Sequence, residues 1–258
     1  MRFVTAGYTI SDSLIQRLRT AKRVVVLTGA GVSAESGVPT FRDALTGLWA
    51  TFDPLELATP SAFARNPKLV WDWYAERRAQ LLQVAPNAGH LALAQLEARV
   101  PAFLLATQNV DGLHARAGSR EIVELHGNIA RVRCSREDRV VKRWDEPLDA
   151  MPPRCPACQA YLRPDVVWFE EMLPSGALER AEAAARDCDL LIVAGTSGEV
   201  YPAAAIPQYA KSAGARVVEV NPNPTPLSAL ADDTLRGPSA VVLPALVEAA
   251  WPAGIGRR

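Results

Sequence analysis

The feature that most constrains the fold is an apolar run that ends in a glycine-rich loop, AKRVVVLTGAG at residues 21–31. β-Branched and apolar residues in one unbroken run are typical of a strand buried on both faces of a parallel sheet. The glycines that follow indicate a tight turn from this strand into a helix. The loop therefore favours an α/β fold.

The same pattern recurs along the chain. Apolar runs that break off in polar or turn residues occur at 102–112, 120–127, 188–197 and 215–224, and helical stretches occur at 90–100 and 177–187. Strands that alternate with helices in this way predict a doubly wound parallel sheet, with the ligand held by loops at its carboxyl edge.

Two blocks break this rhythm. Residues 41–84 are rich in Trp, Phe, Pro and Arg and contain no convincing strand, whereas residues 128–174 hold three cysteines and short strand-like pieces. We expect the two blocks to be insertions that form a second, smaller domain. The large domain would then comprise residues 1–40, 85–127 and 175–258.

Composition excludes several classes of function. The 258 residues contain 28 basic and 28 acidic residues, so no overall charge favours nucleic acid or an anionic membrane. The apolar runs are too short to span a bilayer, and the N-terminus lacks the pattern of a secretory signal. We therefore expect a cytoplasmic protein, in which four cysteines indicate metal binding or burial rather than disulfides.

The glycine loop suits a nucleotide. Gly29, Gly31 and Ala34 fit the pattern G-x-G-x-x-G/A, in which missing side chains let the backbone approach a pyrophosphate; a plain tight turn is the alternative. A dehydrogenase should continue with a second strand closed by an acidic residue that binds the ribose. Asp53 has about the right spacing but follows no strand, which argues against hydride transfer.

Polar residues follow two further strands. TQNVDG places Gln108, Asn109 and Asp111 at a strand end, either as turn formers or as groups that bind a sugar or carboxamide. His126 also lies at a strand end, where a general base of an α/β enzyme is expected, with a structural role as the alternative. His90 and His114 lie early in helices.

Six motifs in order, GAGVSAESGVPTFR, TQNVDGLH, ELHG, RPDVVWFEE, GTSGEVYPAA and EVNPNP, resemble the sirtuins, the NAD-dependent protein lysine deacylases, over about residues 12–250. The resemblance implies a Rossmann-like NAD-binding domain and a smaller domain with a helical part and a zinc-ribbon-like part. NAD and acyl-lysine would meet between them. It implies no nucleic-acid or membrane partner, and we expect a monomer that acts on acyl-lysine proteins or peptides.

The resemblance also implies roles for particular residues. The catalytic residues would be His126, as general base, and Asn109. NAD would contact Gly29, Ala30, Gly31, Glu35, Phe41, Arg42, Gln108, Asn109, Asp111, Gly195, Thr196, Ser197, Asn221 and Ser239. A substrate peptide would pair as a strand between Val167, Trp168 and Phe169 on one side and the segment of Gly198, Val200 and Tyr201 on the other.

The implied reaction consumes NAD. The acyl oxygen attacks C1′ of the nicotinamide ribose and nicotinamide leaves, after which His126 deprotonates the ribose diol and the 2′-oxygen attacks the acyl carbon. The products are free lysine, nicotinamide and acyl-ADP-ribose. Two alternatives stay open: an NAD glycohydrolase or ADP-ribosyltransferase on the same scaffold, and a non-catalytic NAD sensor.

The metal site departs from the family pattern. Sirtuins usually carry two C-x-x-C pairs, but here only Cys155 and Cys158 form one, and Cys134 is followed by Glu137 where its partner should stand. The open readings are a three-cysteine zinc site completed by Glu137 or Asp138, a weak site, or no metal. Cys188 opens an apolar strand and is expected in the core.

The stretch WDWYAERRAQ at 71–80 contains Tyr-x-x-Arg, the mark of the class III sirtuins, which remove acidic acyl groups. Tyr74 and Arg77 would share one helix face and bind a carboxylate, although Arg78 shares that face as well. Ala58 matches a small residue in the enlarged acyl pocket. The resemblance therefore implies removal of succinyl and malonyl groups, with acetyl as an additional substrate.

Overall fold

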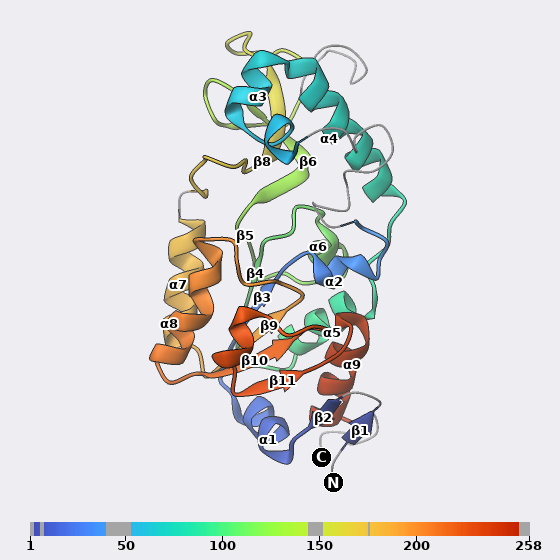
Figure 1. Cartoon of the computed structure of the whole chain (residues 1–258), viewed down its shortest axis with the longest axis vertical. Coiled ribbons are helices and arrows are strands. Elements are labelled where there is room, and N and C mark those ends of the chain that lie inside the picture. The colour runs from blue at the N-terminus through green and yellow to red at the C-terminus, as the bar shows by residue number, and fades with distance from the viewer. Residues whose placement is uncertain (1–2, 6–7, 40–52, 144–151, 175, 253–258) are drawn as a thin grey trace.

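The computed structural model describes residues 3–5, 8–39, 53–143, 152–174 and 176–252 (Figure 1). The predicted parallel sheet is confirmed: six strands pair in the order β11-β10-β9-β3-β4-β5, and every neighbouring pair is parallel. The strands are β3 (Arg23–Thr28), β4 (Ala102–Thr107), β5 (Ile122–Glu124), β9 (Leu190–Ala194), β10 (Arg216–Val220) and β11 (Asp233–Leu235).

The strand order places a crevice at the centre of the sheet. The chain runs outward from β3 through β4 to β5, then returns to the other side of β3 and runs outward again from β9 to β11. The register sets Thr28 beside both Thr107 and Ala194, so the carboxyl ends of β3, β4 and β9 are level. In a doubly wound sheet the ligand binds outside this reversal point, between β3 and β9.

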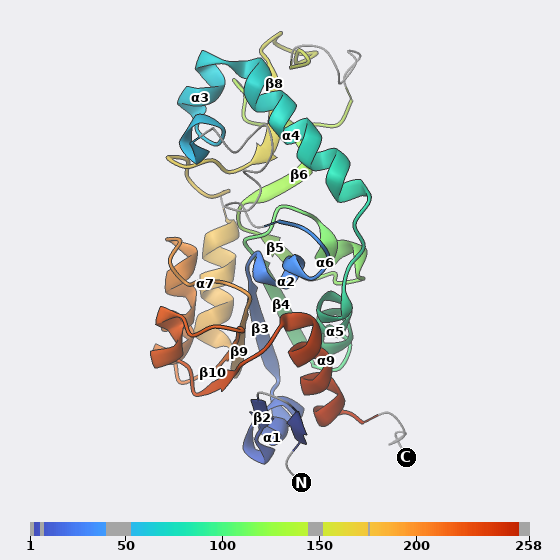
Figure 2. The same cartoon turned by 45° about the vertical axis from the view of Figure 1, so that its right-hand side comes forward.

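Helices cover both faces of the sheet, as Figures 1 and 2 show. The inward residues of β3 alternate: Val24 and Val26 pack on one face, and Val25 and Leu27 on the other. The first face is covered by α1 (Asp12–Thr20), α5 (Ala88–Glu97) and α9 (Ser239–Ala250), and the second by α7 (Ala177–Asp187) and α8 (Ile206–Ser212). The two apolar layers form the core of the large part of the molecule.

The two predicted insertions pack on each other. The first contains η2 (Pro54–Glu56), α3 (Pro60–Arg65) and α4 (Pro67–Leu82), and the second contains an antiparallel sheet of β6 (Gly127–Cys134), β7 (Val140–Val141) and β8 (Leu162–Val166) in the order β7-β6-β8. They share an apolar cluster in which Trp73 and Tyr74 of α4 meet Ile129 and Trp168. Both views place α3, α4 and β8 at one end of the molecule. The division into two domains, with its boundaries, stays a prediction.

The remaining elements are short. They are the hairpin β1 (Phe3–Thr5) and β2 (Tyr8–Ile10), the helices α2 (Gly31–Ala34) and α6 (Leu113–Arg116), and the 3-10 turns η3 (Ala203–Ala205) and η4 (Pro226–Ala229). Within the described ranges, no helix combines the length and the apolar character needed to cross a membrane.

Candidate active site

Two glycine loops meet at the reversal point of the sheet. Gly29 N–H donates to the Ala194 carbonyl at 3.0 Å, and Gly31 N–H donates to the Gly195 carbonyl at 2.8 Å. A Cβ on Gly31 would lie 2.8 Å from Gly195 Cα, and one on Gly195, which has a φ of +61°, would lie 2.4 Å from Val32 N. The missing side chains therefore let the loops after β3 and β9 dock on each other, a second reason for the glycines besides space for a pyrophosphate.

Ser33 of α2 is a hydrogen-bonding centre that the sequence analysis did not single out. Its buried hydroxyl donates to Asp111 Oδ2 at 2.7 Å, accepts from Asn109 Nδ2 at 3.1 Å and lies 3.3 Å from His90 Nε2. His90 Nδ1 accepts from the Asn87 N–H, so the neutral ring carries its hydrogen on Nε2 and donates it to Ser33. The available signal was the place of Ser33 inside the glycine-loop motif.

The polar residues after β4 join this site. Asn109 Nδ2 also donates to the Gly29 carbonyl at 3.1 Å, and Gln108 Nε2 donates to Thr196 Oγ1 at 3.1 Å. The predicted residues of three strand ends, β3, β4 and β9, are thus brought together through direct hydrogen bonds. A pure turn-forming role does not account for these contacts between loops.

His126 follows β5, and within the part of the chain that the structure describes its ring bonds through Nδ1 alone. Its Nδ1 lies 3.0 Å from the Gln108 carbonyl oxygen, which can only accept, so Nδ1 carries the hydrogen in the neutral ring. Nε2 then keeps its lone pair and can take up a proton. Burial lowers the pKa of His126 below its ordinary value, and the bond to the Gln108 carbonyl opposes this shift only in part. The ring is therefore neutral near pH 7, as a general base requires.

The other two histidines are structural. His90 and His114 are buried with their rings 4.8 Å apart, and His114 Nε2 lies 3.0 Å from Thr28 Oγ1. Burial lowers the pKa of His114 to about 3, with the neighbouring His90 acting in the same direction, so it stays neutral at working pH. Of the three histidines that the sequence offered, only His126 is less than fully buried.

Several further residues expected to contact NAD lie around the β9 loop and the start of α9. Asn221 Nδ2 donates to the Thr196 carbonyl at 3.0 Å, and Glu35 Oε2 accepts the Ala240 N–H at 2.7 Å. Ser239 is buried at the first position of α9, whereas Ser197 is exposed. Phe41 and Arg42, also expected to contact NAD, lie outside the described residues.

The two segments assigned to peptide pairing are not strands here. β8 ends at Val166, one residue before the expected Val167–Phe169 strand, and residues 198–201 form bends and a turn. Val167 N–H donates to the His126 carbonyl at 2.9 Å and Phe169 N–H to the Ala58 carbonyl at 3.0 Å. A strand is completed by hydrogen bonds to neighbours on its edges, which a bound peptide would supply.

The residues assigned to the acyl group lie in the cluster shared by α4 and β8. Tyr74 is 2 % exposed and packs with Ala58 and Trp168. Burial raises the pKa of Tyr74 to about 12, and the Arg77 charge opposes this rise. Arg78 instead stacks on Trp71, 4.6 Å from the ring centroid, and Trp71 belongs to the separate cluster around Cys134. The structure thus favours Arg77 over Arg78 as the partner of Tyr74.

Four residues that could ligate a metal gather in the second insertion. The ligand atoms of Cys134, Glu137, Cys155 and Cys158 all lie within 4.8 Å of one another. Four ligands at about 2.3 Å around zinc would lie roughly 3.8 Å apart, so the group fits a tetrahedral site. Cys188 is buried in the core, where its thiol donates to the Ala185 carbonyl at 3.2 Å, as expected.

The two ligand turns have the same backbone form. Asp138 N–H donates to the Cys134 carbonyl at 3.0 Å, and Gln159 N–H donates to the Cys155 carbonyl at 2.9 Å. Asp138 has a φ of +52° and Gln159 a φ of +62°. Glu137 therefore occupies in the first turn the position that Cys158 has in the second. Both carboxylates have an arginine partner, Arg139 for Glu137 and Arg133 for Asp138, but only Glu137 lies in the group of ligand atoms, which favours it as the fourth ligand.

Comparison with known proteins agrees with this geometry. The Sir2 family model matches residues 29–202. An "NAD-dependent protein deacylase" of Ralstonia nicotianae is 56% identical over 234 residues, which cover 89% of this chain and 93% of the relative.

Solved structures are similar over almost the whole chain. A crystal structure of a Sir2 homolog–NAD complex has a TM-score of 0.87 and 44% identity, and the match covers 96% of both chains. A Sir2–p53 peptide–NAD+ structure has a TM-score of 0.79 and 30% identity, covering 92% of this chain and 97% of that one. The fold, the site and these likenesses lead to one conclusion: the chain belongs to the Sir2 family.

Proposed function

We propose that this protein is an NAD-dependent protein lysine deacylase that removes succinyl and malonyl groups, and acetyl as well, from acyl-lysine proteins or peptides. The general activity is supported by Sir2 family membership and by relatives named NAD-dependent protein deacylase. The preference for acidic acyl groups rests on one observation: Tyr74 packs with Ala58 and Trp168 in a buried cluster, and the Arg77 guanidinium acts on Tyr74 from its place over Trp73 of the same cluster.

NAD, as co-substrate, would lie along the joined loops after β3, β4 and β9. The glycine backbone and the amides of Gln108, Asn109 and Asn221 line this region, and His126 Nε2 would accept a proton from a ribose hydroxyl. Bound NAD supplies the electrophilic ribose carbon for acyl transfer. The solved complexes with NAD among structural relatives support this placement.

The physical case for acidic acyl groups is charge complementarity. Hydrogen bonds to charged groups contribute about 1.5–3 kcal/mol each, and about 1.4 kcal/mol corresponds to a factor of ten. Two such bonds from Tyr74 and Arg77 would favour succinyl over acetyl by two orders of magnitude or more. A phenol with a pKa of about 12 remains a donor at neutral pH.

The test compares kcat/KM on matched succinyl-lysine and acetyl-lysine peptides. We expect wild type to prefer succinyl-lysine and Arg77→Met to lower the succinyl-to-acetyl ratio at least tenfold. Arg78→Met is the matched control, because Arg78 stacks on Trp71 in another cluster, and it should keep the wild-type ratio. Equal kcat/KM values for the two peptides in wild type would refute the preference.

Nicotinamide release separates the deacylase from its alternatives. The deacylase should release nicotinamide from NAD only when an acylated peptide is present. Nicotinamide release that does not depend on the peptide would indicate a glycohydrolase. No release under either condition would indicate a non-catalytic NAD sensor.

A further inference from the structure

We infer that Trp168 determines acyl specificity by orienting the Tyr74 hydroxyl as a donor, and that the ion pair between buried Arg163 and partly buried Glu171 positions Trp168. This inference rests on the proposed function, in which Tyr74 and Arg77 bind the carboxylate of the acyl group. It adds three residues to the acyl pocket: one that acts on Tyr74 directly and two that act through Trp168.

The first step is the bond between the two aromatic residues. Trp168 Nε1–H donates to the Tyr74 hydroxyl oxygen at 3.0 Å, and both side chains are buried. Among the described residues the Tyr74 hydroxyl makes no other hydrogen bond, so its own hydrogen has no acceptor. A buried donor without an acceptor is costly, and a ligand carboxylate would supply the missing partner.

The second step is the support of Trp168. The Arg163 guanidinium carbon lies 3.4 Å from the Trp168 ring centroid, and Arg163 Nη2 donates to Glu171 Oε2 at 2.8 Å. That same Glu171 oxygen accepts the Trp168 backbone N–H at 2.8 Å, and Arg163 Nη2 also donates to the Val166 carbonyl at 2.8 Å. The pair therefore binds both the ring and the backbone of Trp168.

The Arg163–Glu171 ion pair that supports Trp168 is itself held in place, with Arg163 in β8 and Glu171 after its end. The Arg163 side chain is 7 % exposed, and its second nitrogen, Nη1, also bonds to Glu171, which makes the pair bidentate. Burial raises the pKa of Glu171, but the bonds from Arg163 outweigh it, so the pKa lies below its ordinary value and the carboxylate stays charged. A planar guanidinium on an indole face adds cation–π attraction.

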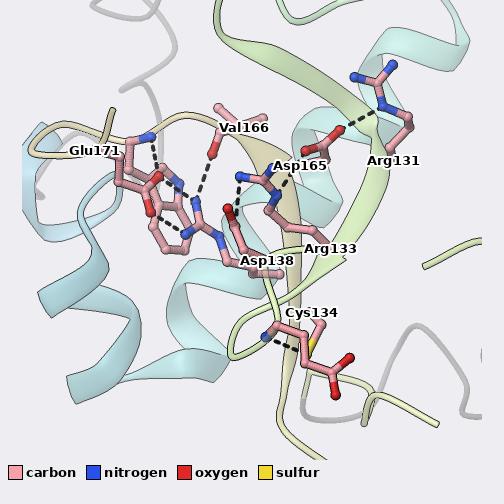
Figure 3. A network of polar contacts seen from close by, with 10 residues as sticks. Arg131, Arg133, Cys134, Asp138, Asp165, Val166 and Glu171 are labelled. Atoms are coloured by element: carbon pink, nitrogen blue, oxygen red, sulfur yellow. Dashed lines mark hydrogen bonds and ion pairs between the residues drawn. The ribbon is translucent and has the colours of Figure 1, made fainter. Parts of the chain in front are cut away.

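The pair is distinct from the other ion pairs of this sheet. Figure 3 shows Glu171 near Val166, while Asp165, the preceding residue, binds Arg131 and Arg133. Because Asp165 has its own two arginines, it does not compete for Arg163. The ring centroids of Phe63 and Trp168 lie 5.4 Å apart, and the two ring planes meet at 44°. The contacts with Arg163 and Phe63 restrain the indole and therefore the direction of its N–H.

The experiment is a double-mutant cycle read out as the succinyl-to-acetyl ratio of kcat/KM. Trp168→Phe keeps a ring but removes the N–H, and it should lower the ratio about tenfold, whatever common effect it has on both peptides. In a Tyr74→Phe background the same change should have no further effect on the ratio, because the group it orients is gone.

The ion pair is tested in the same cycle. Arg163→Lys keeps the charge but loses the fork and the stacking, so KM for the succinyl peptide should rise about tenfold with little change in kcat. In the Tyr74→Phe background this KM effect should also vanish. Trp71→Phe is the matched control, since it removes a buried indole from the Cys134 cluster, and it should keep the wild-type ratio.

The outcomes separate the two proposals. A folded Trp168→Phe protein with the wild-type ratio, or a loss that persists in the Tyr74→Phe background, overturns this inference alone, provided that wild type prefers succinyl and Arg77→Met loses the preference. A wild type without that preference overturns the proposed function, and the inference falls with it. If Trp168→Phe does not fold, the Arg163→Lys cycle decides.

Discussion

Each histidine of this chain has its protonation set by its surroundings. The pKa values of His126, His90 and His114 are all lowered, first by burial, but only His126 is partly exposed, and its Nδ1 bonds to a backbone carbonyl at the site. His90 and His114 bind protein groups inside the fold. If His126 is the general base, its bond to the Gln108 carbonyl fixes the tautomer in which Nε2 can accept a proton.

This gives a prediction for the pH profile. Protonation of His126 Nε2 would remove the base, so kcat/KM should fall on the acid side, with a midpoint below 6.5 because burial lowers the pKa. The measurement is kcat/KM for a succinyl-lysine peptide between pH 5 and 9, with His126→Gln expected to lose activity by about a hundredfold or more. An acid limb centred above pH 7 would contradict the neutral ring described here.

At the scale of elements, the loops after β3 and β9 act as one unit. Gly195 combines a positive φ with a backbone contact that leaves no space for a Cβ, 2.4 Å from Val32 N. These two constraints act on the same residue and cannot be relieved by a side-chain rotation.

We therefore predict that Gly195→Ala destabilises the protein by about 2 kcal/mol or more and weakens NAD binding. Thermal unfolding and NAD titration by calorimetry would measure the two effects. Gly214→Ala is the control for positive φ alone, because Gly214 has a φ of +89° and nothing within 4 Å of its Cβ position. Equal losses in both variants would mean that the loop contact contributes nothing.

The cysteine turns give a prediction about metal. If Glu137 is the fourth ligand, Glu137→Cys should bind cobalt more tightly, with stronger sulfur-to-cobalt charge-transfer absorption, and Glu137→Ala should bind about tenfold or more weakly. Metal titration followed by absorption spectroscopy makes the comparison, and Asp138→Ala serves as the control because Asp138 is bound to Arg133. Identical cobalt spectra for wild type and Glu137→Ala would exclude Glu137 as a ligand.

At the scale of the whole molecule, the buried histidines make stability depend on pH. The folded pKa of His114 is about 3, below the ordinary value of 6.5 that it regains on unfolding. Below pH 6.5 the unfolded chain binds a proton that the folded chain cannot, so stability is complete above 6.5 and is lost as pH falls toward 3.

We predict that His114 alone lowers the free energy of unfolding by about 1.4 kcal/mol between pH 7.5 and 5.5. Urea unfolding at the two pH values gives this difference, and in His114→Asn it should shrink by about that amount. If His114→Asn shows the same difference between the two pH values as wild type, His114 is not the group that titrates.

Several parts of the fold follow from sequence pattern. The run at 177–187 predicted a helix and forms α7 (Ala177–Asp187), and the apolar runs at 188–197 and 215–224 contain β9 and β10. These elements are buried on one or both faces, so their apolar residues recur at a regular spacing that sequence displays. The motifs likewise indicate the family from the sequence alone.

That Tyr74 and Arg77 share one helix face also follows from their spacing in the sequence. The choice of Arg77 rather than Arg78 as the partner of Tyr74 does not. Only the packing of α4 shows that Arg78 stacks on Trp71 in another cluster. Ser33 as a hydrogen-bonding centre, the docking of the two glycine loops and the Arg163–Glu171 support of Trp168 were likewise decided by tertiary structure. Local spacing fixes which residues share a face, whereas contacts between distant segments depend on how the elements pack in three dimensions.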